Sequence, residues 1–283
     1  MTDAQHGLTP DDGVLVPVLQ GRGFDVCVER WDAEETDWRR FDHCILRSCW
    51  DYHLRAGEFL GWLNALDQKH VGLSNPISLV RWNHHKSYLK DLERRGVPIV
   101  PTLLVSQPGA TSLEGVFRAE GWDDIVFKPC ISASGYRTYR VNRARAADYE
   151  DEFEALVRDS GALVQPFLAE VQASGEYSFV FFGREFSHAV LKNPGDGEFR
   201  TQEAFGGVWT AVCPTERQIG EAAMVLDVVD GPLLYARVDM VEVNGRLLLG
   251  ELELIEPFLF FGADGGAAAR FVNELVRLLS SSS

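Results

Sequence analysis

The stretch LLYARVDMVEVNGRLLLGELELIEP, residues 233–257, decides how the rest of the chain is interpreted. Two runs rich in Leu and Val flank an Asn-Gly pair, which is the strongest short-range sequence signal of a β-hairpin. Among these apolar residues lie the carboxylates of Asp239, Glu251, Glu253 and Glu256. Clustered carboxylates repel one another unless a cation compensates them, and Mg²⁺ binds carboxylates together with nucleotide phosphates. The hairpin predicts a magnesium site, and the competing interpretation is a set of solvated strand faces.

The register of this hairpin tests the metal hypothesis. A two-residue turn at Asn-Gly, residues 244–245, sets Asp239 opposite Gly250 and turns Glu251 and Glu253 to the other face. A three-residue loop that begins one residue earlier puts these three carboxylates on one face. We therefore predict a loop with an odd number of residues, although Asn-Gly permits both turns.

A lysine and a small-residue loop precede the hairpin in the sequence. Lys128 stands in the strand-like run DIVFKP, where its desolvation cost would be offset by a bound phosphate. The loop that follows contains Ser132, Ser134 and Gly135, small residues whose backbone N–H groups phosphates can approach closely. The alternative is a lysine that reaches solvent beside an ordinary turn.

A second pair of basic residues lies further along. Lys192 and Arg200 are eight residues apart, with Gly195 and Gly197 between them. Two cations at this spacing are suited to holding a transferred phosphoryl group, so both are candidate catalytic residues. Ordinary surface charge is the alternative interpretation.

The first 78 residues predict an α/β domain. A helix pattern covers residues 13–20, and the strand-like runs FDVCVERW (24–31) and HCILRSCW (43–50) follow it. A doubly wound domain normally opens with an apolar strand, so we expect the first strand to be short or missing. Arg47 and Asp51 flank a strand end, where α/β sheets place ligand-binding loops, and are candidate substrate residues. The neighbouring Trp50 and Tyr52 fit a packing role equally well.

The remaining elements follow from periodicity and end signals. Residues 81–96 read as one amphipathic helix stopped by Gly96. Thr215 and Gln218 form a capping box that opens a helix up to Val229. Strands are expected in DDIVFKP, YRTYRV, ALVQPFL, EYSFVFF and EFSHAVLK, with further helices from about Asp148 and Gly265.

Composition excludes several classes of protein. The chain has 27 Lys and Arg against 42 Asp and Glu, and this net charge of −15 disfavours nucleic acid as a partner. The five cysteines include no CxxC pair, which argues against a disulfide framework or a zinc site. No apolar run is long enough to span a bilayer and no signal peptide is evident, so we expect a soluble, cytoplasmic protein without a membrane partner.

The order of these motifs resembles the ATP-grasp superfamily over residues 81–261, with a Rossmann-like pre-ATP-grasp domain ahead of it. The resemblance implies domains at residues 1–78, 79–167 and 168–283, the second with the phosphate loop and the third with the metal-binding hairpin. The stretches RSCWDY, RWNHHKSYL, FSHAVLK and LLYARVD are similar to the glutathione-synthetase and RimK-like branch, and in particular to the group that contains the O-ureido-serine cyclo-ligase of cycloserine biosynthesis.

The resemblance assigns roles to individual residues. It implies that Lys86 and Lys128 contact the α- and β-phosphates of ATP, and that Glu176 holds the ribose. The adenine would be read by a hinge formed by Gln165, Pro166, Phe167 and Leu168. The magnesium carboxylates would be Asp239 and Glu251, and the basic residues near the γ-phosphate and acyl phosphate would be Lys192 and Arg200. Many members have Asn where this chain has Glu253, so the role of Glu253, like that of Glu256, stays open.

These assignments predict an ATP-dependent, ADP-forming ligase. It would activate a small, amino-acid-like carboxylate as an acyl phosphate for attack by an amine or by a nitrogen of the same molecule. The expected cofactors are ATP and Mg²⁺, with two ions and Mn²⁺ as a substitute, and a homodimer is an open alternative to a monomer. The competing hypotheses are a phosphotransferase of the same fold and a nucleotide-binding protein without turnover.

Overall fold

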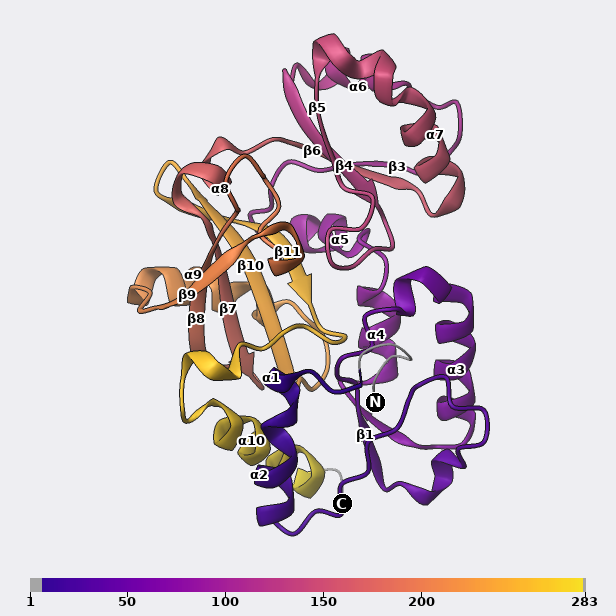
Figure 1. Ribbon diagram of the computed structural model, residues 1–283, viewed down its shortest axis with the longest axis vertical. Helices are drawn as coiled ribbons and strands as arrows, with labels where there is room; N and C mark the ends of the chain where they lie inside the picture. The colour runs from indigo at the N-terminus through magenta and orange to yellow at the C-terminus, as the bar shows by residue number, and fades with distance from the viewer. Residues whose placement is uncertain (1–6, 282–283) are drawn as a thin grey trace.

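The computed structural model describes residues 7–281 as three lobes that meet around a central cavity (Figure 1). Each lobe is built on its own sheet: a two-stranded parallel sheet, a four-stranded antiparallel sheet and a five-stranded antiparallel sheet. This mixture of a βαβ unit with two antiparallel sheets confirms the predicted α/β and α+β character.

The N-terminal region contains the parallel sheet. Helices α1 (Pro10–Gly13) and α2 (Leu15–Gly21) come first, and β1 (His43–Ile45) pairs with β2 (Gly72–Ser74) through the crossover helix α3 (Ala56–Gln68). The short 3-10 helices η1 (Trp38–Arg40) and η2 (Tyr52–Arg55) flank β1. Side chains of Trp31, Phe59, Leu63 and Leu66 fill the core beside the sheet.

The strand expected over residues 24–31 is absent, so that prediction is wrong. Residues 24–29 form no regular element, and Val28 is 46% exposed. Phe24 and Val26 instead pack against the cluster around the C-terminal helix, which buries their apolar side chains without a sheet partner. The chain enters α1 three residues after Gly7, with no strand between Gly7 and Pro10.

The second lobe has the strand order β3-β6-β4-β5. Its strands are β3 (Leu103–Val105), β4 (Asp124–Pro129), β5 (Tyr139–Asn142) and β6 (Ala162–Pro166). Helices α6 (Leu113–Glu120) and α7 (Glu150–Asp159) cover one face of this sheet, with η3 (Arg143–Tyr149) leading into α7 (Figure 1). Strands β4, β5 and β6 and the helix from about residue 148 were predicted from the sequence, and the structure confirms them, whereas β3 was not predicted.

The helix predicted over residues 81–96 is two helices, α4 (Ile77–Asn83) and α5 (Tyr88–Arg94). Residues 84–87 are not helical, because long-range bonds hold them in another conformation. The Asn83 amide donates to the Leu252 carbonyl at 2.8 Å, and the backbone N–H of Lys86 donates to the Cys130 carbonyl at 2.8 Å. Helical periodicity in the sequence contains no signal for such partners.

The third lobe has the strand order β11-β10-β7-β8-β9. After the short helix α8 (Ala169–Ser174) come β7 (Glu176–Phe182), β8 (Glu185–Asn193), η4 (Glu203–Phe205), β9 (Val208–Val212), α9 (Glu216–Asp227), β10 (Tyr235–Val243), β11 (Arg246–Glu253), η5 (Phe261–Ala263) and α10 (Ala267–Ser281). The Thr215–Gln218 capping box is present at the start of α9, as predicted.

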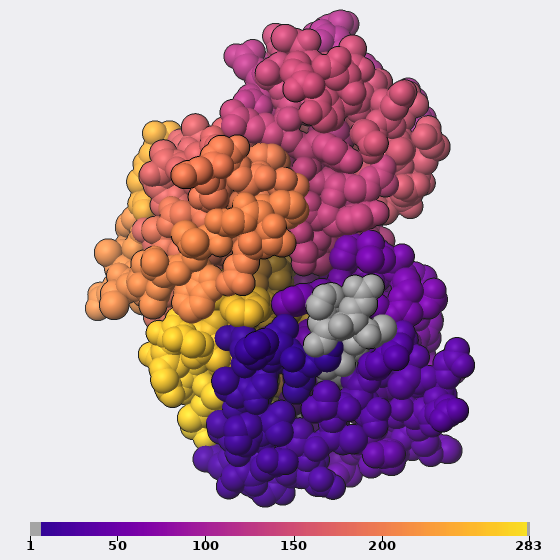
Figure 2. Space-filling model, in the orientation of Figure 1, coloured from indigo at the N-terminus to yellow at the C-terminus, as the bar shows by residue number. Residues whose placement is uncertain are grey.

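Helices cover the two faces of the third sheet. Helices α5 and α9 pack on one face, whereas α2 and α10 cover part of the other. Figure 2 shows the indigo N-terminal helices lying against the yellow C-terminal segment. Beyond the part that α10 covers, the second face of the sheet points into the central cavity. Every second residue of β10 directs its side chain toward this face.

The number of residues in the hairpin turn differs from the prediction, although the carboxylates lie on one face of the hairpin as predicted. Val243 pairs with Arg246, so the turn has two residues, with φ of 51° at Asn244 and 76° at Gly245. The odd-numbered loop that we predicted is therefore wrong. A β-bulge places Gly250 as an extra residue in β11 and shifts the register by one, so that Asp239 lies opposite Glu251.

Candidate active site

The candidate active site is a cavity of about 470 Å³ where the three lobes meet. Thirteen of the residues singled out from the sequence line it: Lys86, Lys128, Ser132, Ser134, Gln165, Phe167, Leu168, Glu176, Lys192, Arg200, Glu251, Glu253 and Glu256. They come from different sheets and from the loops between them. The tertiary structure thus brings together motifs that are more than 150 residues apart in the chain.

Three candidate residues do not line the cavity. Asp239 is only 3% exposed and lies beneath its wall. Arg47 is buried, forms an ion pair with Asp12 at 2.7 Å and donates to the Pro257 carbonyl, so it ties α1 to the segment after β11. Asp51 accepts a hydrogen bond from the Trp31 indole at 2.8 Å and pairs with Arg55. These contacts give Arg47 and Asp51 structural partners away from the cavity.

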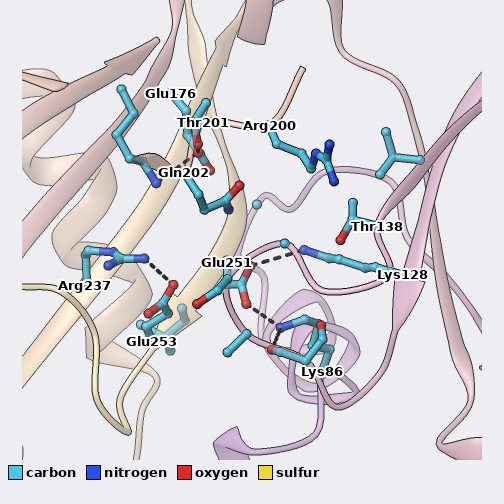
Figure 3. A pocket seen from close by; sticks show the side chains of 18 of the residues that line it. Lys86, Lys128, Thr138, Glu176, Arg200, Thr201, Gln202, Arg237, Glu251 and Glu253 are labelled. Atoms are coloured by element: carbon cyan, nitrogen blue, oxygen red, sulfur yellow. Dashed lines mark hydrogen bonds and ion pairs between the residues drawn. The ribbon is translucent and has the colours of Figure 1, made fainter. Parts of the chain in front are cut away.

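One carboxylate holds two lysines at the centre of the cavity (Figure 3). Glu251 pairs with Lys86 through one oxygen and with Lys128 at 3.2 Å through the other. Lys86 also donates to the Ser132 carbonyl of the small-residue loop at 3.0 Å. Burial would raise the pKa of Glu251, but Lys128 and Lys86 hold it well below its usual range. Both lysines point at the same small space.

A second charged network lies on the adjacent strands β7, β8 and β10. Arg237 contacts both oxygens of Asp239, with an Nε–Oδ1 distance of 3.0 Å and an Nη2–Oδ2 distance of 3.0 Å. Lys192 lies 3.2 Å from Asp239 and 3.0 Å from Glu176. Arg237 also pairs with Glu253, which lies opposite it across the hairpin. Three carboxylates are thereby linked through two cations.

Negative charge is in excess at the hairpin despite these pairs. Burial raises the pKa of Glu253 to about 7, with Asp239 and Glu251 adding to the effect of burial against the opposing charge of Arg237. Burial and the neighbouring Glu253 raise the pKa of Glu256 to about 8. Both carboxyls thus resist ionisation because further positive charge is lacking.

This donor set fits a divalent cation. Asp239, Glu251 and Glu253 present hard oxygen ligands on one face of the hairpin, and a cation would relieve the excess negative charge around them. Within residues 7–281, no three acidic, histidine or cysteine side chains converge closely enough to hold a metal as they stand. The lysines and Arg237 occupy these carboxylates instead, so a metal would bind in exchange for some of these ion pairs.

Comparison with known proteins identifies the family. Residues 1–75 match the family described as D-cycloserine synthetase DcsG, N-terminal domain. The whole chain is 30% identical to the cycloserine biosynthesis protein DcsG of Streptomyces lavendulae over 290 residues, with 95% of each chain covered. The chain belongs to the DcsG family. The crystal structure of D-cycloserine synthetase DcsG superposes with a TM-score of 0.89 at 30% identity over 98% of both chains.

More distant solved structures share the fold of this DcsG family member. D-alanine–D-alanine ligase from Bacillus anthracis has a TM-score of 0.70 at 13% identity, covering 98% of this chain and 97% of the ligase. The ATP-grasp ligase PsnB has a TM-score of 0.62 at 17% identity, with coverage of 94% and 97%. The chain therefore has the predicted ATP-grasp fold and is an ATP-dependent ligase. In the described residues, no helix is both long and apolar enough to cross a membrane.

At one end of the cavity of this DcsG family member lie the residues of the expected hinge. Gln165 is nearly buried, and its amide donates to the Thr102 hydroxyl at 2.9 Å. The Phe167 backbone N–H donates to the Asp124 carbonyl at 2.9 Å, and the Arg140 guanidinium lies 3.5 Å above the Phe167 ring. These contacts fix the strand end next to Leu168. The hinge is rigid at its side chains and apolar where it faces the cavity.

The loop after β8 lies over the small-residue loop. Arg200 pairs with Glu198 at 2.6 Å and lies 3.5 Å above the Phe205 ring. A Cβ atom on Gly135, whose φ is 71°, would lie 2.9 Å from the Phe205 ring, so only glycine permits this approach. Arg200 and Lys192 are not paired with each other and are held by different carboxylates.

Reasoning from the sequence missed Arg237, Trp50 and Tyr52 as cavity residues. Arg237 carried a usable signal, because it stands two residues before Asp239 in an apolar strand and must share its face. Trp50 and Tyr52 lie just beyond β1, where the strand end meets the cavity, whereas the charged residues beside them turn away. The sequence around an aromatic residue at a strand end does not indicate whether its side chain lines a cavity or packs in the core.

Proposed function

We propose that this chain is an ADP-forming ligase that activates the carboxylate of a small, amino-acid-like substrate as an acyl phosphate. An amine, or a nitrogen within the same molecule, then attacks the activated carbonyl. The observation that carries this proposal is the convergence of Lys86 and Lys128, from separate elements, on Glu251 beside a loop of small residues. Two buried cations at one point are the arrangement that a polyphosphate requires.

The cavity offers a place for each part of ATP. The hinge at Gln165, Phe167 and Leu168 would bind adenine, and Glu176 would accept hydrogen bonds from the ribose hydroxyls. Lys86 and Lys128, with backbone N–H groups at Ser132 and Ser134, would hold the α- and β-phosphates. Phosphate oxygens are stronger partners for the two lysines than a shared carboxylate, so Glu251 would then be available to a cation.

The proposed metal ligands are Asp239 and Glu251, with Glu253 as a third. Magnesium supplies Lewis-acid neutralisation of phosphate charge when bound. We propose two ions, with Mn²⁺ able to substitute, because Mg²⁺ and Mn²⁺ both prefer oxygen ligands. Arg237 pairs with Asp239 and Glu253 and would hold both side chains in place on this face of the hairpin.

The chemistry proposed for the chain has two steps. A substrate carboxylate oxygen attacks the γ-phosphorus, the bond to the β-phosphate oxygen breaks, and ADP leaves. A neutral nitrogen then attacks the acyl carbon, the carbon–oxygen bond to phosphate breaks, and the nitrogen loses a proton as inorganic phosphate departs. Lys192, Arg200 and Arg237 would stabilise the negative charge that develops on the transferred group.

The similarity to DcsG supports the substrate class. That relative is named a D-cycloserine synthetase, and both the sequence alignment and the structural superposition cover nearly the whole of both chains. We propose that this chain performs the same class of reaction, with ring closure by an internal nitrogen among its possible outcomes. The domain limits 1–78, 79–167 and 168–283 and a homodimer are further parts of the proposal, testable by limited proteolysis and light scattering.

Trapping of the acyl phosphate tests the proposal. The protein is incubated with Mg²⁺, ATP, a panel of small amino acids and hydroxylamine, and both ADP and hydroxamate are measured. We expect at least one substrate to release ADP and give a hydroxamate in equal amounts. Accumulation of a phosphorylated alcohol without hydroxamate would show a phosphotransferase instead.

A further inference from the structure

One buried acidic side chain of the cavity has no ion pair within residues 7–281. Glu256 is 5% exposed and lines the cavity, and no hydrogen bond or ion pair reaches its carboxylate from the described residues 7–281. Its backbone oxygen accepts a hydrogen bond from the Trp50 indole at 3.2 Å, which fixes the segment after β11 against the N-terminal lobe. A buried carboxylate that opens on a cavity without a partner is costly and points to a ligand.

The four carboxylates of β7, β10 and β11 at this site each pair with a cation. Glu251 holds two lysines, Glu253 holds Arg237, and Asp239 and Glu176 share Lys192. Binding of phosphates would draw the lysines further toward the nucleotide. Since no cation among residues 7–281 pairs with Glu256, a positively charged group on a molecule in the cavity would be its partner.

The walls around Glu256 are aromatic. Trp50 and Tyr52 line the cavity from the N-terminal lobe, and Phe258 and Phe260 line it from the segment that follows Glu256. The rings of Phe258 and Phe260 are 4.9 Å apart, and Trp209 lies 5.2 Å from Phe260. Burial raises the pKa of the Tyr52 hydroxyl, and the Glu256 charge acts in the same direction.

Aromatic faces and a carboxylate together select an organic cation. Ring faces attract an ammonium group, and a carboxylate forms charge-assisted hydrogen bonds with it. A magnesium ion needs several oxygen ligands, which aromatic rings do not supply. The rings would also exclude water and so strengthen the pairing between Glu256 and an ammonium group.

We propose that Glu256 binds the ammonium group of the carboxylate substrate and thereby makes the enzyme select amino acids over simple carboxylic or hydroxy acids. The inference rests on the proposed function, because it takes the cavity to hold the carboxylate that is activated. The substrate would lie with its carboxylate toward Arg237 and the lysines, and with its ammonium group at the aromatic end. Glu256 is thus a specificity-determining residue of the site.

The test compares amino acids with analogues that lack the ammonium group: alanine against propionate and lactate, and serine against glycerate, in both enantiomers. ADP release and hydroxamate formation are measured at saturating ATP and Mg²⁺, and binding of the same pairs is measured by calorimetry with a non-hydrolysable ATP analogue. We expect the wild type to prefer an amino acid over its hydroxy analogue.

The variant Glu256→Gln keeps the shape of the side chain and removes its charge. A lost charge-assisted hydrogen bond corresponds to about 10- to 100-fold, so kcat/KM for the amino acid should fall by that factor. The KM for ATP and the kcat/KM of the hydroxy analogue should stay unchanged, and Glu256→Asp should restore part of the preference. The exposed Glu216→Gln at the start of α9 is the matched control and should change none of these values.

Several results would overturn the inference. These are an equal loss for amino and hydroxy acids in Glu256→Gln, a raised Mg²⁺ requirement with an unchanged preference, or a wild type that binds no amino acid better than its analogue. Hydroxamate formed equally well from acids with and without the ammonium group would refute the role of Glu256 and leave the ligase proposal intact. Phosphorylated alcohol without hydroxamate would refute the ligase proposal itself.

Discussion

The two ends of the cavity differ in how their charges are balanced. Around Lys86, Lys128 and Glu251, each ionised group lies within an ion pair, and the partners come from separate elements. Around Glu256, the walls are aromatic, and no side chain among residues 7–281 pairs with the carboxylate. The paired end is suited to a polyphosphate, whose oxygens can replace Glu251 as partners of the two lysines. The unpaired end is suited to a substrate that carries a positive charge of its own. Charge balance thus separates the nucleotide part of the site from the substrate part.

The largest effect is expected at Arg200, on the loop that lies over the small-residue loop. Arg200→Ala should lower kcat by on the order of 10²- to 10³-fold, because a charge-stabilising donor is lost in the transition state. The KM for ATP should change little. Steady-state kinetics measure both, with Arg217→Ala as the control, since Arg217 pairs with Glu221 and Glu242 on the surface. Equal losses in kcat and in ATP affinity would make Arg200 a binding residue.

The next largest effect is expected at the paired end of the cavity, from the variant Lys128→Ala. Affinity for ATP should fall by about 10- to 100-fold, the value of a charge-assisted hydrogen bond to phosphate. The midpoint of thermal unfolding should change little, because Lys86 still neutralises Glu251. Calorimetric titration with ATP and Mg²⁺ measures the affinity, and Lys90→Ala, which removes a lysine paired with Glu93, is the control. Unchanged nucleotide affinity would exclude Lys128 from the phosphate site.

The unpaired end can be examined through pH. The pKa of Glu256 is raised from 4.5 in the unfolded chain to about 8, so the folded protein keeps a proton that the unfolded chain releases. This contribution to the free energy of unfolding is complete below pH 4.5 and is lost as the pH rises to 8. It amounts to about 1.4 kcal/mol for each unit by which the folded and unfolded pKa values of Glu256 differ. Glu256→Gln should therefore lose less stability between pH 5 and pH 8 than the wild type. Urea midpoints at the two pH values measure this, and parallel curves would contradict it.

The smallest effect is expected away from both ends, at the capping box of α9. Thr215 accepts from the Gln218 backbone, and the Gln218 side chain accepts from the Thr215 backbone at 2.9 Å. Thr215→Ala should lower the free energy of unfolding by about 1 kcal/mol, the usual value of an N-cap. Kinetic constants should stay unchanged, which sets a reference for variants of the cavity. Urea denaturation measures the stability, and a loss of turnover would show that α9 positions the site.

The sequence alone determined those features whose causes are local. The Asn-Gly turn, the capping box at Thr215 and the strand runs of the second and third lobes depend on neighbouring residues, and the structure contains all of them. The order of the motifs was also sufficient to predict the ATP-grasp fold and thirteen residues of the cavity lining. A side chain in a strand shares its face with every second neighbour, so short motifs already specify which groups point together.

Only the tertiary structure decided which charges meet. The bulge at Gly250, rather than the turn, aligns Asp239 with Glu251, and the break at residues 84–87 brings Lys86 to a carboxylate 165 positions away. Arg47 and Asp51 have structural partners, while no cation among the described residues 7–281 pairs with Glu256. Local sequence sets backbone preferences over a few residues, whereas the pairing of buried charges depends on which distant segments share one space. The packing of distant segments therefore decides which charged residues stabilise the fold through ion pairs and which face the cavity without such a pair.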